Sequence, residues 1–355
     1  MINFKDMLRS DESLIRDDVP LSYDFQPKVL RFREPEQRQF ATAIKPLLQE
    51  RNGRNLFVYG PPGVGKTVAC RHVLRELEET IDNVITIYIN CWKNNTAYKM
   101  VVDLCQQIGI TFITNQKTSE LFSRAVQILN KKSVVFVFDE IDKLEDFDLL
   151  YMVLEEVYRK AIFLITNYKE KVQQLDERIM SRLTPELIEF KSYNKEEIHG
   201  ILAERMKYAF SPNVWDEHAF SAIVEKTHAL ADLRKGLFLM REAANLAEEK
   251  AQRNITLSEV KTAMAKLDES ANVPVELDED FKIILKLVQK TPGLKMGDLF
   301  QQFLSTGGEM SYRSFTRRIE KLSELKHIAL QKATRGNEGN TTLVNPYAEK
   351  KLTDY

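Results

Sequence analysis

The sequence predicts an α/β fold, in which a parallel sheet with flanking helices is followed by a helical domain and a C-terminal winged helix-turn-helix. Three observations predict it. Short β-type apolar runs alternate with helical segments between about residues 55 and 190. Helical periodicity then continues alone to about residue 267, and a basic helix precedes two short β-type runs near the end. Strands separated by helices imply a parallel sheet with both faces covered.

The length of 355 residues favours two or three domains. We expect an N-terminal arm and α/β domain over 1–193, a helical domain over 194–267, called the lid below, and a C-terminal domain over 281–355. The segment between the last two, residues 268–280, is acidic, contains a proline and has no periodicity. Such a segment is typical of a linker.

The apolar runs predict four strands, at residues 56–59, 84–89, 134–138 and 161–166. A first helix is expected to begin near Glu34, because proline is tolerated in a first turn and acids there favour the helix dipole. Helical periodicity in the lid region predicts helices over 196–208, 217–226, 233–253 and 256–267.

Composition excludes several classes of protein. No apolar run approaches the roughly 18 to 20 residues that a membrane span needs, and the N-terminus has no pattern of a secretory signal. Three cysteines without C-x-x-C spacing fit reduced thiols in a cytoplasm better than a disulfide framework or a zinc site. The net charge of −1 gives no overall attraction to nucleic acid, so the local distribution of charge decides that question.

A G-x-x-x-x-G-K-T motif lies between the first strand and a helix that runs on from Val68. It consists of Gly60, Pro61, Pro62, Gly63, Val64, Gly65, Lys66 and Thr67. This pattern predicts a phosphate-binding loop, because its glycines let backbone N–H groups point inward at a helix N-terminus. We expect it to bind ATP or ADP, with Lys66 on the β- and γ-phosphates and Thr67 on Mg²⁺.

The third strand ends in two adjacent acids, Asp139 and Glu140. Ligands of open α/β sheets bind at the carboxyl ends of the strands, so these acids are expected at the phosphate site. We assign Asp139 to Mg²⁺, and Glu140 to orienting and deprotonating the water that attacks the γ-phosphate. Alone, such a pair is also common in a solvated turn after a strand.

Further polar residues are candidates for the same site. Asn167 follows the fourth strand, where its amide could contact the γ-phosphate or the attacking water, although asparagine after a strand is usually a turn residue. Arg178 and Arg182 lie four residues apart on one helix face, where arginines are mostly solvated. Asp232 is a plausible N-cap for a helix that has Arg234 in its first turn. A cation there opposes the dipole, which suggests a phosphate partner for Arg234.

The order of these motifs resembles the AAA+ ATPases, and within them the archaeal origin-recognition and replication-initiator branch. The resemblance extends over residues 20–350. It includes Leu30-Arg31-Phe32-Arg33-Glu34, which resembles the segment that leads into the adenine pocket, and Ile89-Asn90-Cys91 after the second strand. Asp232-Leu233-Arg234 resembles the G-D-x-R sensor motif, with Ala231 in place of the usual glycine.

The resemblance implies roles for individual residues. Asn167 would be the first sensor and Arg234 the second, and Arg33 and Val68 would contribute to nucleotide binding. Arg182 would be an arginine finger that acts on a neighbouring subunit, with Arg178 one turn away as the alternative.

Residues 281–355 carry 13 Lys and Arg against 7 Asp and Glu, a net charge of +6. A helix from Ser311 places Tyr312, Phe315, Ile319 and Leu322 on one face, which we assign to the core. A winged helix with a basic recognition helix would bind duplex DNA, although a winged helix can also make protein contacts. The predicted DNA-binding residues on that helix and on the hairpin after it are Arg313, Arg317, Lys321, Lys332 and Arg335.

The leading hypothesis is an ATP-dependent initiator that binds duplex origin DNA and helps recruit or load the replicative helicase, with slow hydrolysis as a switch. Self-association on DNA and a cytoplasmic location are expected, without a membrane partner. Two alternatives stay open at this point: a DNA-binding regulator in which nucleotide is a structural latch, and an AAA+ ATPase of transposition or defence.

Overall fold

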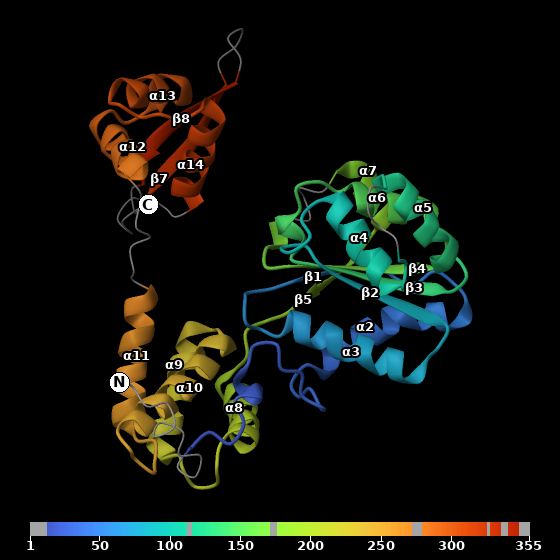
Figure 1. Cartoon of the computed structure of the whole chain (residues 1–355), viewed down its shortest axis with the longest axis vertical. Helices are drawn as coiled ribbons and strands as arrows, with labels where there is room; N and C mark the ends of the chain where they lie inside the picture. The colour runs from blue at the N-terminus through green and yellow to red at the C-terminus, as the bar shows by residue number, and fades with distance from the viewer. Residues whose placement is uncertain are drawn as a thin grey trace, which may run out of the picture. The chain divides into compact units, whose positions relative to one another are not determined.

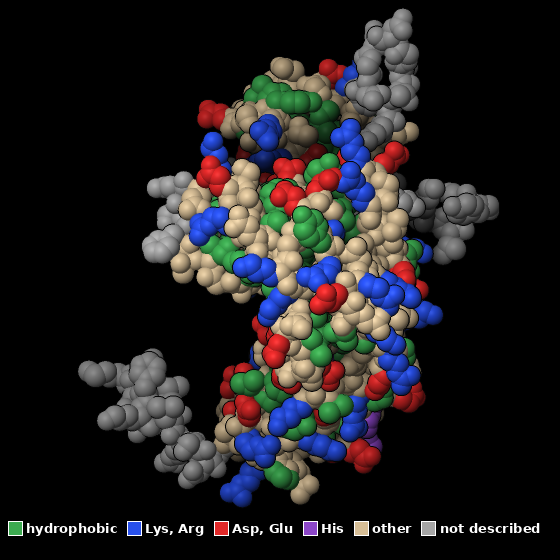
Figure 2. Space-filling view, turned by 90° about the vertical axis from the view of Figure 1, so that its right-hand side faces the viewer, with side chains coloured by type: hydrophobic (Ala, Val, Ile, Leu, Met, Phe, Trp, Pro, Cys, Tyr) green, Lys and Arg blue, Asp and Glu red, His purple; other side chains and the backbone are tan. Residues whose placement is uncertain are grey.

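The computed structural model describes residues 13–111, 116–170, 176–271, 279–324, 327–334 and 340–347. The chain forms two compact units, Met1–Leu267 and Asp268–Tyr355 (Figure 1). On the face drawn in Figure 2, basic and acidic side chains are interspersed.

The first unit contains a five-stranded parallel sheet in the order β2-β3-β4-β1-β5. The strands are β1 (Leu56–Tyr59), β2 (Val84–Asn90), β3 (Ser133–Asp139), β4 (Lys160–Thr166) and β5 (Glu186–Glu189). All residues of β3 are buried, as a sheet covered on both faces requires. The predicted parallel α/β fold and its four predicted strands are confirmed.

Strand β5, which was not predicted from the sequence, lies at the edge of the sheet beside β1. Its sequence is Glu-Leu-Ile-Glu, and Ile188 is its one buried residue. A mostly exposed strand of this kind lacks the apolar run by which the other strands were predicted. Its place at the sheet edge is set by main-chain pairing with β1.

Helices cover both faces of the sheet (Figure 1). Alternation along β3 separates the two layers, since Val135 and Val137 pack with the α2–α3 side and Phe136 and Phe138 with the other side. One layer contains α2 (Glu34–Ile44) and α3 (Lys66–Thr80), and the other contains α4 (Ala97–Gln107), α5 (Thr118–Leu129), α6 (Asp148–Glu156) and α7 (Glu177–Leu183). Short 3-10 helices are η2 (Val19–Leu21), η3 (Lys45–Gln49) and η4 (Ile141–Lys143).

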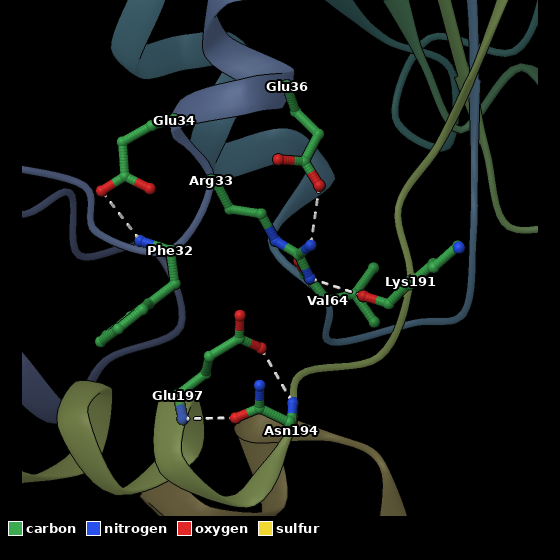
Figure 3. Close-up of polar contacts among 8 residues, drawn as sticks. All are labelled: Phe32, Arg33, Glu34, Glu36, Val64, Lys191, Asn194 and Glu197. Carbon is green, nitrogen blue, oxygen red and sulfur yellow. Dashed lines mark hydrogen bonds and ion pairs between the residues drawn. The ribbon is translucent and has the colours of Figure 1, made fainter.

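Four helices form the lid region: α8 (Lys195–Ala209), α9 (Glu217–Leu230), α10 (Leu233–Glu249) and α11 (Leu257–Ala271). Asn194 and Glu197 form a capping box that begins α8 (Figure 3). The N-terminal arm packs on this region, because Leu14 and Leu21 are buried in its core. The parallel sheet, the lid and the N-terminal arm therefore belong to one compact unit.

The predicted linker, residues 268–280, is partly helical. Helix α11 continues to Ala271 and α12 begins at Glu279. Residues 272–278 lie outside the described part of the chain. Both helices therefore extend into the segment that was predicted to be a linker.

The second unit is built from three helices and a three-stranded antiparallel sheet in the order β6-β8-β7. The helices are α12 (Glu279–Lys290), α13 (Met296–Ser305) and α14 (Tyr312–Glu324), and the strands are β6 (Leu294–Lys295), β7 (Ile328–Thr334) and β8 (Asn340–Pro346). Its core includes Phe303, Phe315 and Ile319, which are fully buried.

Within the described residues, no helix has the length and apolar character needed to cross a membrane.

Candidate functional site

The phosphate-loop sequence connects the end of β1 to the start of α3, where Gly65 is the N-cap with a φ of 87°. Gly63 also has a positive φ, of 75°. Both glycines are crowded as well, since a Cβ at Gly63 would collide with the Asp232 carboxylate and one at Gly65 would lie 2.7 Å from the Tyr193 hydroxyl. A side chain at either position would therefore be strained in conformation and in space. The loop packs directly against the start of α10 and against the connection into the lid.

Lys66 is buried at the centre of the loop. Its Nζ donates to the carbonyl oxygens of Gly60 and Pro61, each at 2.7 Å, and to the side-chain oxygen of Asn167 at 2.8 Å. Burial lowers the pKa of Lys66 to about 8. The contact with Asn167 brings the end of β4 to the loop, in agreement with the expected position of that residue.

Asp139 ends β3 and is buried. Its Oδ2 accepts hydrogen bonds from the Thr67 hydroxyl at 2.7 Å and from the Tyr88 hydroxyl. Its Oδ1 accepts the backbone N–H of Glu140 at 3.0 Å. The two residues predicted to hold the metal are therefore in direct contact.

Glu140 has a left-handed backbone, with φ 58° and ψ 45°. Strand alternation would send adjacent side chains to opposite faces, but this turn leaves Asp139 and Glu140 lining the same cavity. A left-handed non-glycine residue costs roughly 1–3 kcal/mol and is common at functional sites. Burial and the charges of Asp139 and Asp142 raise the pKa of Glu140, which moves it toward the range that suits a general base.

These groups surround a cavity of about 160 Å³. The sheet, the lid and the N-terminal arm all contribute to its lining. The predicted site residues found in it are Gly63, Gly65, Lys66, Thr67, Val68, Asp139, Glu140, Asn167 and Arg234. Gly60, Pro61, Pro62 and Val64 belong to the same loop, but the described lining does not include them.

Arg234 reaches the cavity from α10. Asp232 is the N-cap of this helix as predicted, and its carboxylate accepts the backbone N–H of Arg234 at 3.0 Å. The Arg234 guanidinium is exposed and makes no ion pair with a described residue. Its charge acts on Lys66 and Glu140, whose pKa values are dominated by burial. The lid thus places a free cation opposite the phosphate loop.

A second cavity, of about 60 Å³, adjoins the first and shares Gly65, Val68, Arg205 and Leu233 with it. The rest of its lining is largely apolar and aromatic. It includes Phe25, Pro27, Val29, Leu30, Tyr193, Ile201 and Tyr208. The arm and the lid therefore form an apolar extension of the phosphate cavity.

Arg205, which was not predicted as a site residue, is buried on α8 and lines both cavities. Its guanidinium donates to the carbonyls of Pro20 and Phe25 at 3.4 Å and lies 4.3 Å from the centre of the Phe25 ring. Burial lowers its pKa to about 10. A signal was present, because Arg205 occupies the buried stripe of α8 that also contains Ile198 and Leu202.

Arg33 contacts the phosphate loop from outside the described lining of the two cavities. Its buried guanidinium donates to the carbonyls of Val64 at 3.1 Å and Lys191 at 2.6 Å and to the Glu36 carboxylate at 2.8 Å (Figure 3). It also lies 3.9 Å from the centre of the Tyr193 ring. Arg33 thus fixes the loop to the chain that enters the lid, and the described lining of the two cavities does not include it.

Arg182, the predicted finger, pairs with the Glu155 carboxylate and lies 5.5 Å from the centre of the Tyr151 ring. It is on α7 and outside the described lining of the phosphate cavity. Arg178 is exposed on the same helix and makes no ion pair with a described residue. Neither arginine is positioned to act on the site of its own chain.

In the second unit, Arg313, Arg317 and Lys321 are exposed along α14, while Phe315, Ile319 and Leu322 are buried beneath them. The predicted core position of Tyr312 is wrong, because this residue is 49% exposed. It lies at the first turn, where its ring makes an edge contact with Phe300.

Two basic residues of α14 contact the start of the second unit. Lys321 lies with its Nζ 5.8 Å from the centre of the Phe281 ring. Arg318, which was not among the predicted DNA-binding residues, pairs with Asp280 at 2.8 Å. Lys332 lies in β7, and Arg335 lies outside the described residues.

Comparisons with known proteins cover nearly the whole chain. The model of a family described as an AAA domain matches residues 49–173, and that of a Cdc6 AAA+ ATPase-type lid domain matches residues 199–265. The ORC1-type DNA replication protein 1 of Sulfurisphaera tokodaii is 30% identical, over 95% of this chain and 91% of its own. The protein of the same description from Sulfolobus acidocaldarius is 29% identical, over 93% and 89%.

Among solved structures, the Aeropyrum pernix ORC1 protein, determined in complex with DNA, is similar to this chain with a TM-score of 0.71. The two share 27% sequence identity, and the match covers 95% of each chain.

Proposed function

This chain belongs to the ORC1-type DNA replication proteins, a family of AAA+ ATPases that act in replication initiation, and we propose that it uses ATP to control its binding to duplex origin DNA. The observation that carries the proposal is the phosphate cavity, where Lys66 and Thr67 from the start of α3, Asp139 from the end of β3 and Arg234 from the lid helix α10 line one space. The relatives described above are replication proteins. They favour initiation over the regulatory, transposition or defence alternatives.

Each residue of the cavity has a role in this proposal. Lys66 and the loop N–H groups bind the phosphates, and Asn167 contacts the γ-phosphate or the attacking water. Glu140 orients that water and accepts its proton, which its raised pKa favours. Arg234 binds the phosphates from the lid, so nucleotide would draw the lid toward the loop.

The adjoining apolar cavity would hold the adenine. It is lined by aromatic and aliphatic side chains and lies at the helix α3 end of the phosphate loop, through Gly65 and Val68. Apolar walls with a few polar groups are typical of such base sites. Arg205 lines both cavities and would contact the nucleotide between base and phosphates.

Thr67 and Asp139 fit a magnesium site. A hydroxyl and a carboxylate in contact suit Mg²⁺, which binds few protein oxygens and keeps several waters. When bound, Mg²⁺ would neutralise charge on the β- and γ-phosphates.

The second unit would bind DNA as a winged helix-turn-helix, with α14 in the major groove and the β7–β8 hairpin as the wing. The exposed cations Arg313 and Arg317 support this assignment. The DNA complex of the Aeropyrum relative supports it further. Recruitment of the replicative helicase and self-association on DNA are proposed from the family resemblance.

Glu140→Gln tests the switch. We expect the variant to bind ATP with unchanged affinity while hydrolysis falls at least 100-fold, since one general base contributes about 10²–10⁴ in rate. DNA bound in cells by the wild type and by Glu140→Gln is then mapped. Binding confined to short elements where replication starts, and altered by the variant, supports the proposal. Promoter-wide binding that the variant leaves unchanged contradicts it.

A further inference from the structure

Tyr88 lies on β2, beside the strand that ends in Asp139. In the parallel pairing of β2 with β3, Tyr88 is in register with Val137, two residues before Asp139. Side chains two residues apart leave the same face of a strand. Tyr88 and Asp139 therefore face the same layer, the one that contains α3 and the phosphate loop.

The Tyr88 hydroxyl donates to Oδ2 of Asp139, the oxygen that also accepts the Thr67 hydroxyl at 2.7 Å. Oδ1 of the same carboxylate is held by the backbone N–H of Glu140 at 3.0 Å. Three donors from three parts of the chain thus fix the orientation of one carboxylate. A carboxylate bound on both oxygens has little freedom to rotate.

Tyr88 itself is held firmly. The Gln107 side-chain amide bonds to both backbone groups of Tyr88, accepting its N–H at 3.0 Å and donating to its carbonyl at 2.9 Å. The Arg71 guanidinium lies 4.0 Å from the centre of the Tyr88 ring. Arg71 and Thr67 are four residues apart on α3, so they lie on the same face of that helix. The helix that supplies Thr67 therefore also covers Tyr88.

We propose that Tyr88 is a positioning residue for the magnesium site: its hydroxyl holds the Asp139 carboxylate in the orientation from which Asp139 and Thr67 face the same cation. The inference rests on the proposed nucleotide and magnesium site. Groups that orient metal ligands typically change metal affinity by about 10–100-fold when removed. A tyrosine that only filled space beneath the site would have no such effect, because phenylalanine fills nearly the same volume.

Tyr88→Phe removes this hydroxyl and nothing else. The measurement is the affinity of a fluorescent ATP analogue, first in EDTA and then over a Mg²⁺ titration. We expect affinity in EDTA to stay within about twofold of wild type, while the Mg²⁺ concentration needed for half of the tightening rises about 10-fold or more. Tyr158→Phe is the matched control, because that residue is 70% exposed and lies at the opposite end of the sheet, before β4.

Thermal unfolding establishes that Tyr88→Phe is folded. Arg71→Met is a second variant that leaves the hydroxyl in place but uncovers the ring, and a rise in the Mg²⁺ requirement of about threefold or more is expected for it. A Mg²⁺ titration of Tyr88→Phe that matches wild type would overturn the inference, and so would equal losses in EDTA and in Mg²⁺. If Mg²⁺ fails to tighten nucleotide binding by the wild-type chain, the proposed site itself is wrong.

Discussion

Lys66 places a titratable charge at the centre of the nucleotide cavity. Because burial lowers its pKa to about 8, the free protein loses this charge above pH 8. Bound phosphates favour the charged form, so above pH 8 nucleotide binding must take up a proton. We predict that affinity for an ATP analogue is constant below pH 8 and falls above it, by up to about tenfold per pH unit. Binding measured in EDTA from pH 7 to pH 9.5 checks this.

The matched control for that prediction is Lys66→Arg. Arginine stays protonated over this range, so its affinity, whatever its value, should not depend on pH. Calorimetry in two buffers with different ionisation enthalpies should detect the proton uptake for the wild type at pH 8.5. A wild-type affinity that is flat from pH 8 to pH 9.5 would contradict the assignment of the charge to Lys66.

Single residues differ in how far sequence could assign them. Lys66, Thr67 and Asp139 were predictable because local motifs fix their positions at strand and helix ends. The contacts of Arg33 were not predictable, since its partners Val64 and Lys191 are 31 and 158 residues away. A family pattern suggested that Arg33 contributes to nucleotide binding, whereas the structure places it beside the loop and outside the described lining of both cavities. The family pattern could not indicate that the Arg33 guanidinium donates to the carbonyl groups of Val64 and Lys191.

At the scale of elements, the sequence predicted those whose own composition carries the signal. β3 is continuously apolar and buried, and α14 has a buried face opposite an exposed basic one. β5 and β6 were not predicted, because each is short, partly exposed and held by pairing with a distant strand. A linker was predicted over residues 268–280, but the ends of α11 and α12 could not be set from an acidic segment alone.

Helix α14 carries the second element-scale prediction. Arg317 is exposed and makes no ion pair with a described residue, so its charge is available to a DNA phosphate. Each phosphate contact contributes about −0.9 to the slope of log affinity against log salt concentration. We predict that Arg317→Ala weakens duplex binding and reduces the magnitude of this slope by about one. Fluorescence anisotropy at several salt concentrations measures both.

Two control variants separate the loss of a phosphate contact at Arg317 from unfolding and from a general loss of positive charge. Arg253→Ala removes an exposed arginine of the first unit and should leave the slope unchanged. Arg318→Ala breaks the pair with Asp280, so it should lower stability of the second unit in addition to any effect on binding. An unchanged affinity and slope for Arg317→Ala would remove this residue from the interface.

At the scale of the whole molecule, the phosphate cavity joins segments far apart in sequence. The loop contacts Asp232 at the start of α10, and Arg33 links the loop to the entry of the lid. Arg234 adds a cation from the lid. A change in nucleotide state would therefore act on loop, arm and lid together. For the nucleotide state to affect a second copy of the chain, one copy must supply a side chain to the cavity of the other.

Arg182 is the candidate for that group, since it pairs with Glu155 in its own chain and lies outside the described lining of its own cavity. A finger supplied by a neighbour is worth about 10³–10⁵ in rate. We therefore predict that ATPase activity per chain rises with protein concentration on DNA, and that Arg182→Ala loses this rise. Arg182→Ala retains an intact nucleotide site, and Glu140→Gln retains the arginine finger. A mixture of the two variants should therefore recover activity.

Arg178→Ala is the matched control for this mixing experiment, as it removes the neighbouring arginine of α7. If Arg182 is the finger, Arg178→Ala should keep the rise in activity with concentration. If Arg178 is the finger instead, Arg178→Ala should lose this rise and Arg182→Ala should keep it. A mixture no more active than the sum of its components would show that neither copy completes the other's site. In that case the nucleotide cavity would operate within one chain, with Arg234 of the lid as the cation that meets the γ-phosphate.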